Sequence, residues 1–160
     1  MQPVRASDQP KIDLNEPVAS LLRRKNPAIW SILPESTVYE AIELMAEKHI
    51  GALVVLEAGR LEGIVSERDY ARKVILKGKH SQETCVREIM TTPVLFVRPH
   101  RSIDECMRMM TAHRVRHLPV LEGERVVGIV SIGDLVNWII QSHEQTIHQL
   151  QSYITGAYPA

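Results

Sequence analysis

A glycine, a serine and an aspartate recur at one spacing in two segments of the chain. The motif Gly-Ile-Val-Ser-x-x-Asp occupies residues 63–69 and again residues 128–134. The apolar residues before each serine are typical of a buried strand, and the serine is typical of a helix start. The free backbone N–H groups of a helix N-terminus attract phosphate, and a serine hydroxyl can donate to the same anion. The carboxylate one turn later has two oxygens, which can accept both hydroxyls of a ribose.

The same residues have a purely structural interpretation. Ser66 and Ser131 are suitable N-caps, and an aspartate three residues later is close to a capping box. Local physics alone leaves both interpretations open. Capping explains the serine and the aspartate but not the recurring glycine, which allows another group to approach the backbone closely.

The two motifs belong to an internal duplication that positions them. Residues 32–75 align without a gap with residues 97–140, and a segment upstream, 18–22, matches 86–90 at a slightly larger offset. Each copy predicts a strand, a helix, a hairpin of two buried strands and a second helix. A unit of about 60 residues buries too little surface to be stable alone. We therefore expect the two copies to press their sheets together.

With these motifs in place, the chain resembles a tandem pair of CBS domains (cystathionine-β-synthase-type domains), an arrangement called a Bateman module. The resemblance rests on the two Gly-Ile-Val-Ser-x-x-Asp segments, on Val-Arg-Glu-Ile-Met-Thr at 86–91 and on Arg-His-Leu-Pro-Val at 116–120. It implies an α+β fold of two strand-helix-strand-strand-helix repeats packed through their sheets, plus an extended C-terminal helix. The expected divisions are a flexible N-terminal segment (1–16), repeat 1 (17–80), a linker (81–85), repeat 2 (86–142) and a C-terminal helix and tail (143–160).

The resemblance also implies two clefts between the repeats that bind adenosine nucleotides such as AMP, ADP, ATP or NAD(H), or S-adenosylmethionine. In the family the motif aspartate holds the ribose, the serine or threonine helps to hold phosphate, and strands sandwich the base. Carried over, the first site would consist of Ile32, Ala52, Leu53, Ser66, Arg68 and Asp69. The second would consist of Val97, His117, Leu118, Ser131 and Asp134. The further candidate phosphate partners are Arg116, Lys25, Arg68 and Arg72.

The two implied sites differ in residue type. Arg68 is matched in the second copy by Gly133, whereas Arg116 and His117 are matched in the first copy by Gly51 and Ala52. These differences indicate that one site binds phosphate better than the other, or that the two hold different ligands.

We expect a stand-alone regulatory module that passes its signal to a separate protein, and not an enzyme. The alternative is a non-catalytic dimeric scaffold without a small-molecule ligand, in which the motif only caps helices. An enzyme would need a nucleophile or a base in a cleft, and only His117 is a candidate. His113 and His117 are four residues apart, but a helix end is predicted between them and no cysteine or carboxylate completes a ligand set. No metal site is therefore expected.

Composition limits the partners further. The chain has 160 residues, of which 44% are hydrophobic, and 19 basic side chains balance 19 acidic ones. Without a basic footprint, neither nucleic acid nor an anionic membrane is expected as a partner. Two cysteines and the lack of a long apolar stretch indicate a reduced, cytoplasmic protein. The apolar residues of the last helix continue at helical spacing to Ile154, and this stripe, like the family resemblance, favours a homodimer.

Overall fold

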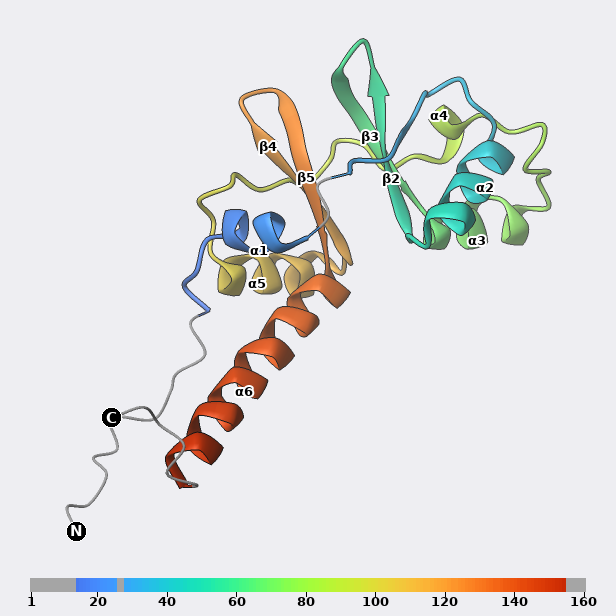
Figure 1. Ribbon diagram of the computed structural model, residues 1–160. Coiled ribbons are helices and arrows are strands. Elements are labelled where there is room, and N and C mark those ends of the chain that lie inside the picture. The colour runs from blue at the N-terminus through green and yellow to red at the C-terminus, as the bar shows by residue number, and fades with distance from the viewer. Residues whose placement is uncertain (1–13, 26–27, 155–160) are drawn as a thin grey trace.

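The computed structural model describes residues 14–25 and 28–154 (Figure 1). The short helix α1 (Val18–Arg24) precedes the first repeat. The repeat itself consists, in order, of β1 (Ser31–Ile32), α2 (Val38–Lys48), β2 (Ala52–Glu57), β3 (Arg60–Ser66), α3 (Glu67–Lys73) and the 3₁₀ helix η2 (Ile75–Lys77). A second short helix precedes those of the second repeat, in the order α4 (Val86–Ile89), α5 (Ile103–His113), β4 (His117–Glu122), β5 (Arg125–Ser131) and α6 (Ile132–Ile154). The expected α+β repeat is confirmed, although the first strand of the second copy is reduced to a parallel bridge between Val97 and Val120.

Helix α2 begins where the sequence predicts it, at a capping box. The Thr37 hydroxyl accepts from the Glu40 N–H at 3.1 Å, and the Glu40 carboxylate accepts from the Thr37 N–H at 3.0 Å. Ser102 caps α5 in the same way through the Glu105 N–H. Each of these helices buries one apolar face, which ends at Met45 in α2 and at the equivalent Met110 in α5.

The two hairpins repeat each other in register. Leu53 lies opposite Val65 in the β2–β3 pair, and Leu118 lies opposite Val130 in the β4–β5 pair. Both pairs are antiparallel, and both carry an irregularity at the same point, after Val55 and after Val120. The duplication in the sequence is therefore a duplication of backbone geometry.

The short helix in front of each repeat packs on the other repeat, as Figure 1 shows. Val18 and Leu21 of α1 belong to the buried core of the second repeat, and the Val18 N–H donates to the Arg101 carbonyl at 2.7 Å. Val86 and Ile89 of α4 belong to the core of the first repeat. The two repeats therefore exchange their leading helices, which the sequence analysis did not predict.

The exchange explains the glycine of the motif. A Cβ atom at Gly63 would lie 2.7 Å from the Met90 sulfur, and one at Gly128 would lie 2.8 Å from a methyl carbon of Leu22. Both distances are shorter than van der Waals contact. The group that approaches the backbone is thus Met90, just after α4, at Gly63 and Leu22, in α1, at Gly128.

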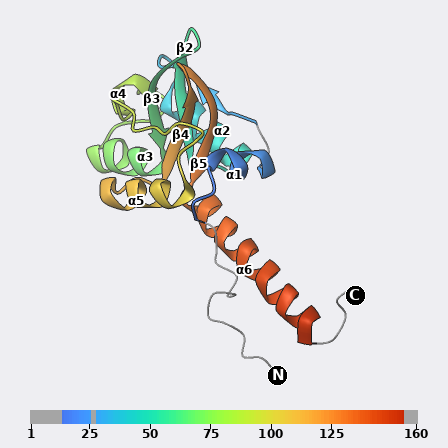
Figure 2. The ribbon, with the colours of Figure 1, turned by 90° about the vertical axis from the view of Figure 1, so that its left-hand side faces the viewer.

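The two sheets pack against each other, as expected. Val54 of the first repeat forms a buried cluster with Leu121 and Val126 of the second. Helix α6 starts at Ile132 and projects away from this body as one continuous helix (Figures 1 and 2). The predicted C-terminal helix and tail (143–160) begins within this helix, which also includes the predicted end of repeat 2, and residues 155–160 lie outside the described part.

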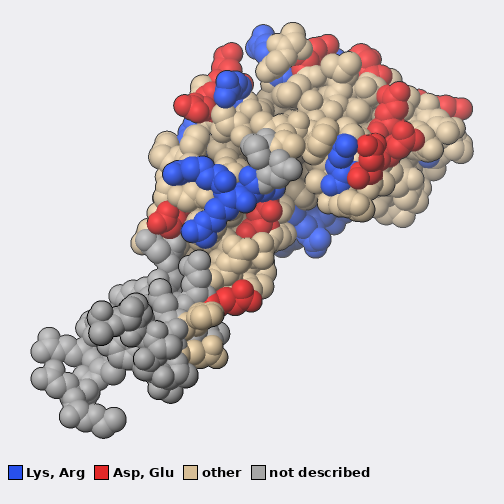
Figure 3. Space-filling view, viewed as in Figure 1, with Lys and Arg blue, Asp and Glu red and all other residues tan. Residues whose placement is uncertain are grey.

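The two predicted connecting segments are partly described. Of the predicted flexible segment, residues 1–13 lie outside the described part, whereas the carbonyls of Leu14 and Glu16 accept from the first turn of α5. In the predicted linker, Thr84 is buried and its carbonyl accepts from the Val38 N–H. Among the described residues, no helix is long and apolar enough to cross a membrane. Basic and acidic side chains are interspersed on the face shown in Figure 3.

Candidate functional site

Two clefts contain the motif residues. The Asp134 cleft, of about 410 Å³, is lined by Ser131 and Asp134 together with residues of the first repeat such as Trp30 and Lys48. The Asp69 cleft, of about 500 Å³, is lined by residues 66–69 and by residues 114–117 of the second repeat. Each cleft is therefore built from both repeats.

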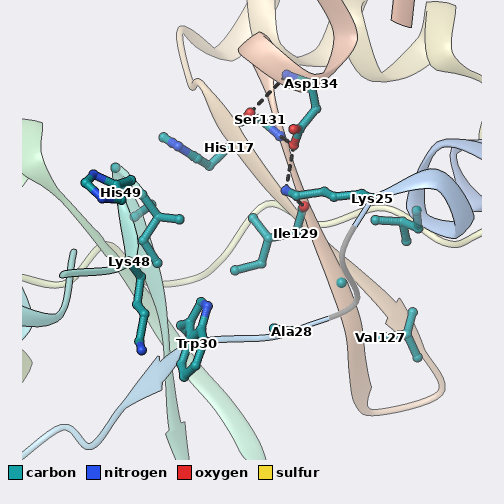
Figure 4. A pocket seen from close by; sticks show the side chains of 15 residues that line it. Lys25, Ala28, Trp30, Lys48, His49, His117, Val127, Ile129, Ser131 and Asp134 are labelled. Carbon is teal, nitrogen blue, oxygen red and sulfur yellow. Dashed lines mark hydrogen bonds and ion pairs between the residues drawn. The ribbon is translucent and has the colours of Figure 1, made fainter. Parts of the chain in front are cut away.

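One oxygen of the Asp134 carboxylate accepts hydrogen bonds within the protein, and the other is available to a ligand. Its Oδ2 accepts from the Ser131 N–H at 2.8 Å and from the Lys25 ammonium at 2.6 Å (Figure 4). The Asp134 N–H donates to the Ser131 hydroxyl, which completes a capping box at the start of α6. The Oδ1 oxygen has no hydrogen-bond partner among the described residues. The structural and the ligand-binding interpretations of the motif are thus compatible at this position.

An aromatic surface lies at the other end of the Asp134 cleft. Trp30 is 38% exposed, and the Lys48 ammonium lies 4.3 Å from the centroid of its ring. Figure 4 shows Ile129 between Asp134 and Trp30. A flat indole beside an aliphatic side chain is a surface on which a base can stack. The sequence analysis did not single out Trp30 or Lys48, although Trp30 falls in the predicted first strand.

Both oxygens of the Asp69 carboxylate already accept hydrogen bonds within the protein. Its Oδ2 accepts from both the N–H and the hydroxyl of Ser66, each at 3.0 Å. Its Oδ1 accepts from the Lys73 ammonium at 2.9 Å and from the Thr91 hydroxyl at 3.3 Å. Asp69 is only 9% exposed. Both carboxylates complete a capping box, but among the described residues only Asp69 also uses its Oδ1 oxygen within the protein.

His117 and Gly51 line both clefts and form the wall between them. A Cβ atom at Gly51 would lie 3.5 Å from the imidazole of His117. Burial lowers the pKa of His117 below its ordinary value of 6.5, and the nearby charge of Lys25 lowers it further. The imidazole is therefore neutral at pH 7 and can both donate and accept a hydrogen bond.

Most of the predicted polar site residues meet as expected. Ser66, Arg68 and Asp69 share one cleft, and Lys25, His117, Ser131 and Asp134 share the other. The predicted phosphate partner Arg72 also lines the Asp69 cleft.

One predicted residue lies in a different cleft from the rest of its expected site. Ala52, expected with Ser66 and Asp69, lines the Asp134 cleft, whereas Arg116, which was expected only as a phosphate partner, lines the Asp69 cleft. The reason is geometric: the start of β2 faces the second repeat, and the segment before β4 faces the first.

The predicted apolar site residues lie elsewhere. Leu53, Val97 and Leu118 are buried in the cores, and Ile32 packs against the core of the first repeat. The two clefts are lined without these four residues. Their alternation along the strands directs them inward, away from the clefts.

Comparison with known proteins gives a consistent result. The sequence model of the CBS domain matches residues 18–76 and 86–141. A protein with CBS domains from Burkholderia ambifaria has a solved structure that is 50% identical in sequence, with a TM-score of 0.77, and the match covers 79% of this chain and 95% of that one. The mitochondrial CBS domain-containing protein CBSX3 of Arabidopsis thaliana is 40% identical over 129 residues, which are 78% of this chain and 63% of that protein.

One of the similar structures contains ligands derived from adenosine. The CBS domain pair of protein MJ0100 was solved in complex with 5′-methylthioadenosine and S-adenosyl-L-methionine. It is 26% identical to this chain with a TM-score of 0.68, and the match covers 76% of this chain and 94% of that pair.

Proposed function

Because this chain belongs to the CBS-domain family, with two repeats in tandem, we propose that it is a regulatory module that binds adenosine nucleotides between them. The proposed ligands are AMP, ADP, ATP or NAD(H), and the adenosine ligands of the MJ0100 pair support this class. Binding would favour one arrangement of the repeats over another and so pass a signal to a separate protein. We propose that the module does not catalyse a reaction. We also propose a cytoplasmic location, which the two free cysteines support.

The geometry of the Asp134 cleft carries the proposal. The available Oδ1 oxygen of Asp134 can accept from a ribose hydroxyl, and the partly exposed ring of Trp30 can stack on a base. Lys25, which already contacts the carboxylate, supplies a cation at the same end. Together these features suit a nucleoside, because the carboxylate can accept from the ribose and the aromatic surface can stack on the base.

A thermal-melt panel with AMP, ADP, ATP, NAD, NADH and S-adenosylmethionine tests the function. A ligand at 100 times its Kd should stabilise the fold by about 2.7 kcal/mol. For a chain of this size, that free energy corresponds to a Tm increase of roughly 5 to 10 °C. We expect such a shift with at least one adenosine ligand and its loss in Asp134→Asn.

The matched control is Asp104→Asn, which removes a half-buried carboxylate from the first turn of α5, where it is paired with Arg108. It should retain the ligand-induced shift relative to its own ligand-free midpoint. If none of the ligands shifts the Tm of the wild-type protein, the scaffold without a small-molecule ligand becomes the better account.

We also propose that the protein is a homodimer that pairs along α6. Val136 and Ile140 are each 48% exposed on this helix, which projects from the body (Figure 2). The sequence continues this apolar stripe at Ile147, Leu150 and Ile154. Successive members of the stripe are three, four or seven residues apart, which is the spacing of a seam between two paired helices. Light scattering on a sizing column should give twice 18.1 kDa for the wild type and 18.1 kDa for Ile140→Lys. The control Gln141→Lys, at an exposed polar position, should remain dimeric.

A further inference from the structure

Lys25 lies where the two copies of the duplication differ in length. Between the leading helix and the first strand, the first copy has three residues more than the second. Helix α1 has seven residues, whereas α4 has four. The longer helix ends at Arg24, and Lys25 is its C-cap. Lys25 therefore belongs to an extra turn that only the first copy has.

The Lys25 ammonium is held in the Asp134 cleft by two acceptors. It donates to the Ile129 carbonyl at 2.8 Å and to the Asp134 Oδ2 oxygen at 2.6 Å (Figure 4). The side chains of Lys25 and Asp134 are 37% and 24% exposed, so water and salt screen their attraction less than that of a fully exposed ion pair. A ligand that displaced the ammonium would have to break both contacts.

The Asp69 cleft has the same pair of contacts, made by a different residue. Thr91, which follows α4, donates through its N–H to the Ile64 carbonyl at 2.8 Å and through its hydroxyl to the Asp69 carboxylate at 3.3 Å. Ile64 and Ile129 are equivalent in the duplication, as are Asp69 and Asp134. In the second repeat, one ammonium therefore contacts both the strand carbonyl and the carboxylate. The packing of a leading helix on the sheet of the other repeat brings a donor to this place in both clefts.

These contacts limit how many ribose hydroxyls the Asp134 carboxylate can hold. Each carboxylate oxygen has two lone pairs that accept hydrogen bonds. Both lone pairs of Oδ2 are used, by the Ser131 N–H at 2.8 Å and by the Lys25 ammonium. A ribose that places one hydroxyl on each oxygen needs a lone pair on Oδ2 as well as on Oδ1. Within the part of the chain that the structure describes, Oδ1 alone retains lone pairs for such a contact.

We propose that Lys25 determines how the Asp134 cleft recognises a ribose, because it occupies Oδ2 and limits the carboxylate to one of the two hydroxyls. This inference rests on the proposed function and deepens it, since it names the ribose contact that the cleft makes. The motif alone allows both hydroxyls on the carboxylate, and the resemblance implies a phosphate on Lys25. The observed contacts give Lys25 a different role. The second hydroxyl has no carboxylate oxygen to donate to, so a nucleoside that lacks it binds as well as a ribonucleoside.

Titration calorimetry with adenosine, 2′-deoxyadenosine and 3′-deoxyadenosine tests the inference, because none of the three has a phosphate that binds to a lysine. For the wild type, we expect one of the two deoxyadenosines to bind within about twofold of adenosine. The other lacks the hydroxyl that donates to Oδ1. Its Kd should be at least about tenfold higher, since it loses a hydrogen bond to a charged group.

The variant Lys25→Met removes the ammonium at a similar side-chain length and frees a lone pair of Oδ2. In this variant we expect both deoxyadenosines to bind at least about tenfold more weakly than adenosine, because each now loses a hydrogen bond to the carboxylate. The control Lys77→Met removes an exposed lysine from η2 and should keep the wild-type pattern. Each comparison is made between ligands on one protein, so a change in stability does not alter it.

Asp134→Asn should abolish adenosine binding, which assigns the titration to this cleft. Given that dependence, the inference is overturned if the wild type already discriminates against both deoxyadenosines, or against neither. It is also overturned if Lys25→Met and the wild type give the same pattern. The proposed function stands in these cases, since adenosine still binds through Asp134. If adenosine does not bind to the wild type, this inference fails, and the thermal-melt panel decides separately on the proposed function.

Discussion

His117 is a residue at which the charges of both clefts act together. Burial is the largest influence on its pKa, and three cations lower the pKa in the same direction: Lys25, Arg116 and Arg68. Asp134 alone opposes them. Because the folded protein disfavours the protonated imidazole, His117 contributes a pH dependence to stability.

The sign of this dependence follows from the two protonation states. In the unfolded chain, His117 titrates near its ordinary value of 6.5, and in the folded protein it titrates at a lower pH. Below pH 6.5 the unfolded state therefore binds more protons, and the free energy of unfolding falls as the pH falls. We expect His117→Gln to lose less stability than the wild type between pH 7.5 and pH 5.5, as measured by urea denaturation. His100→Gln, which removes an exposed histidine, should behave like the wild type. Identical pH dependence in wild type and His117→Gln would contradict the argument.

At the scale of elements, the glycines of the motif fix how closely the exchanged helices approach the sheets. Gly128→Ala places a methyl group 2.8 Å from the end of the Leu22 side chain, which must shift to make room. We expect a loss of about 1–3 kcal/mol in the free energy of unfolding. The double variant with Leu22→Ala should recover part of it, because the clash is then removed. Chemical denaturation of the four proteins of this cycle gives the coupling.

Gly133→Ala is the matched control. A Cβ atom there meets only the Ser131 hydroxyl at 3.6 Å, which is an ordinary contact. Since Gly133 lies in α6, alanine should be neutral or stabilising by up to about 1 kcal/mol. If Gly128→Ala behaved like Gly133→Ala, the close approach would not be the reason for the glycine.

Local signals predicted most elements, because the elements depend on local physics. The Thr37 capping box and the hairpin at Ala58 and Gly59 can be identified from a few neighbouring residues. The exchange of α1 and α4 cannot, since their apolar residues fit either sheet equally well by type. The position of Ala52 could not be predicted for the same reason, since it lines a cleft that only the packing of the two repeats defines.

At the scale of the whole molecule, each core contains residues from both ends of the duplication. Leu21 is 4% exposed and packs in the second repeat, although it precedes the first. Leu21→Ala should therefore cost about 2–5 kcal/mol. We expect the chain to unfold in one transition rather than repeat by repeat, because neither core is complete without the other half.

Two tryptophans allow this cooperativity to be measured. Trp30 precedes β1 of the first repeat, and Trp138 lies in α6 and belongs to the core of the second. Fluorescence of Trp138→Phe then follows the first repeat, and fluorescence of Trp30→Phe follows the second. After each midpoint is corrected for its own Trp→Phe change, the addition of Leu21→Ala should move both curves equally. An earlier transition at Trp138 alone would show that the second repeat unfolds independently.

The crossed position of α1 and α4 also indicates how such a chain could originate. In a single ancestral repeat, the leading helix would have had an apolar face that its own sheet did not cover. Only the sheet of a second molecule could have covered it, so the repeat would have existed as a swapped dimer. Head-to-tail fusion of two genes would convert that contact between molecules into one within a chain, and its strength would no longer depend on concentration. Joined copies are free to diverge, and the equivalent residues Gly51 and Arg116 now differ although both line the Asp69 cleft.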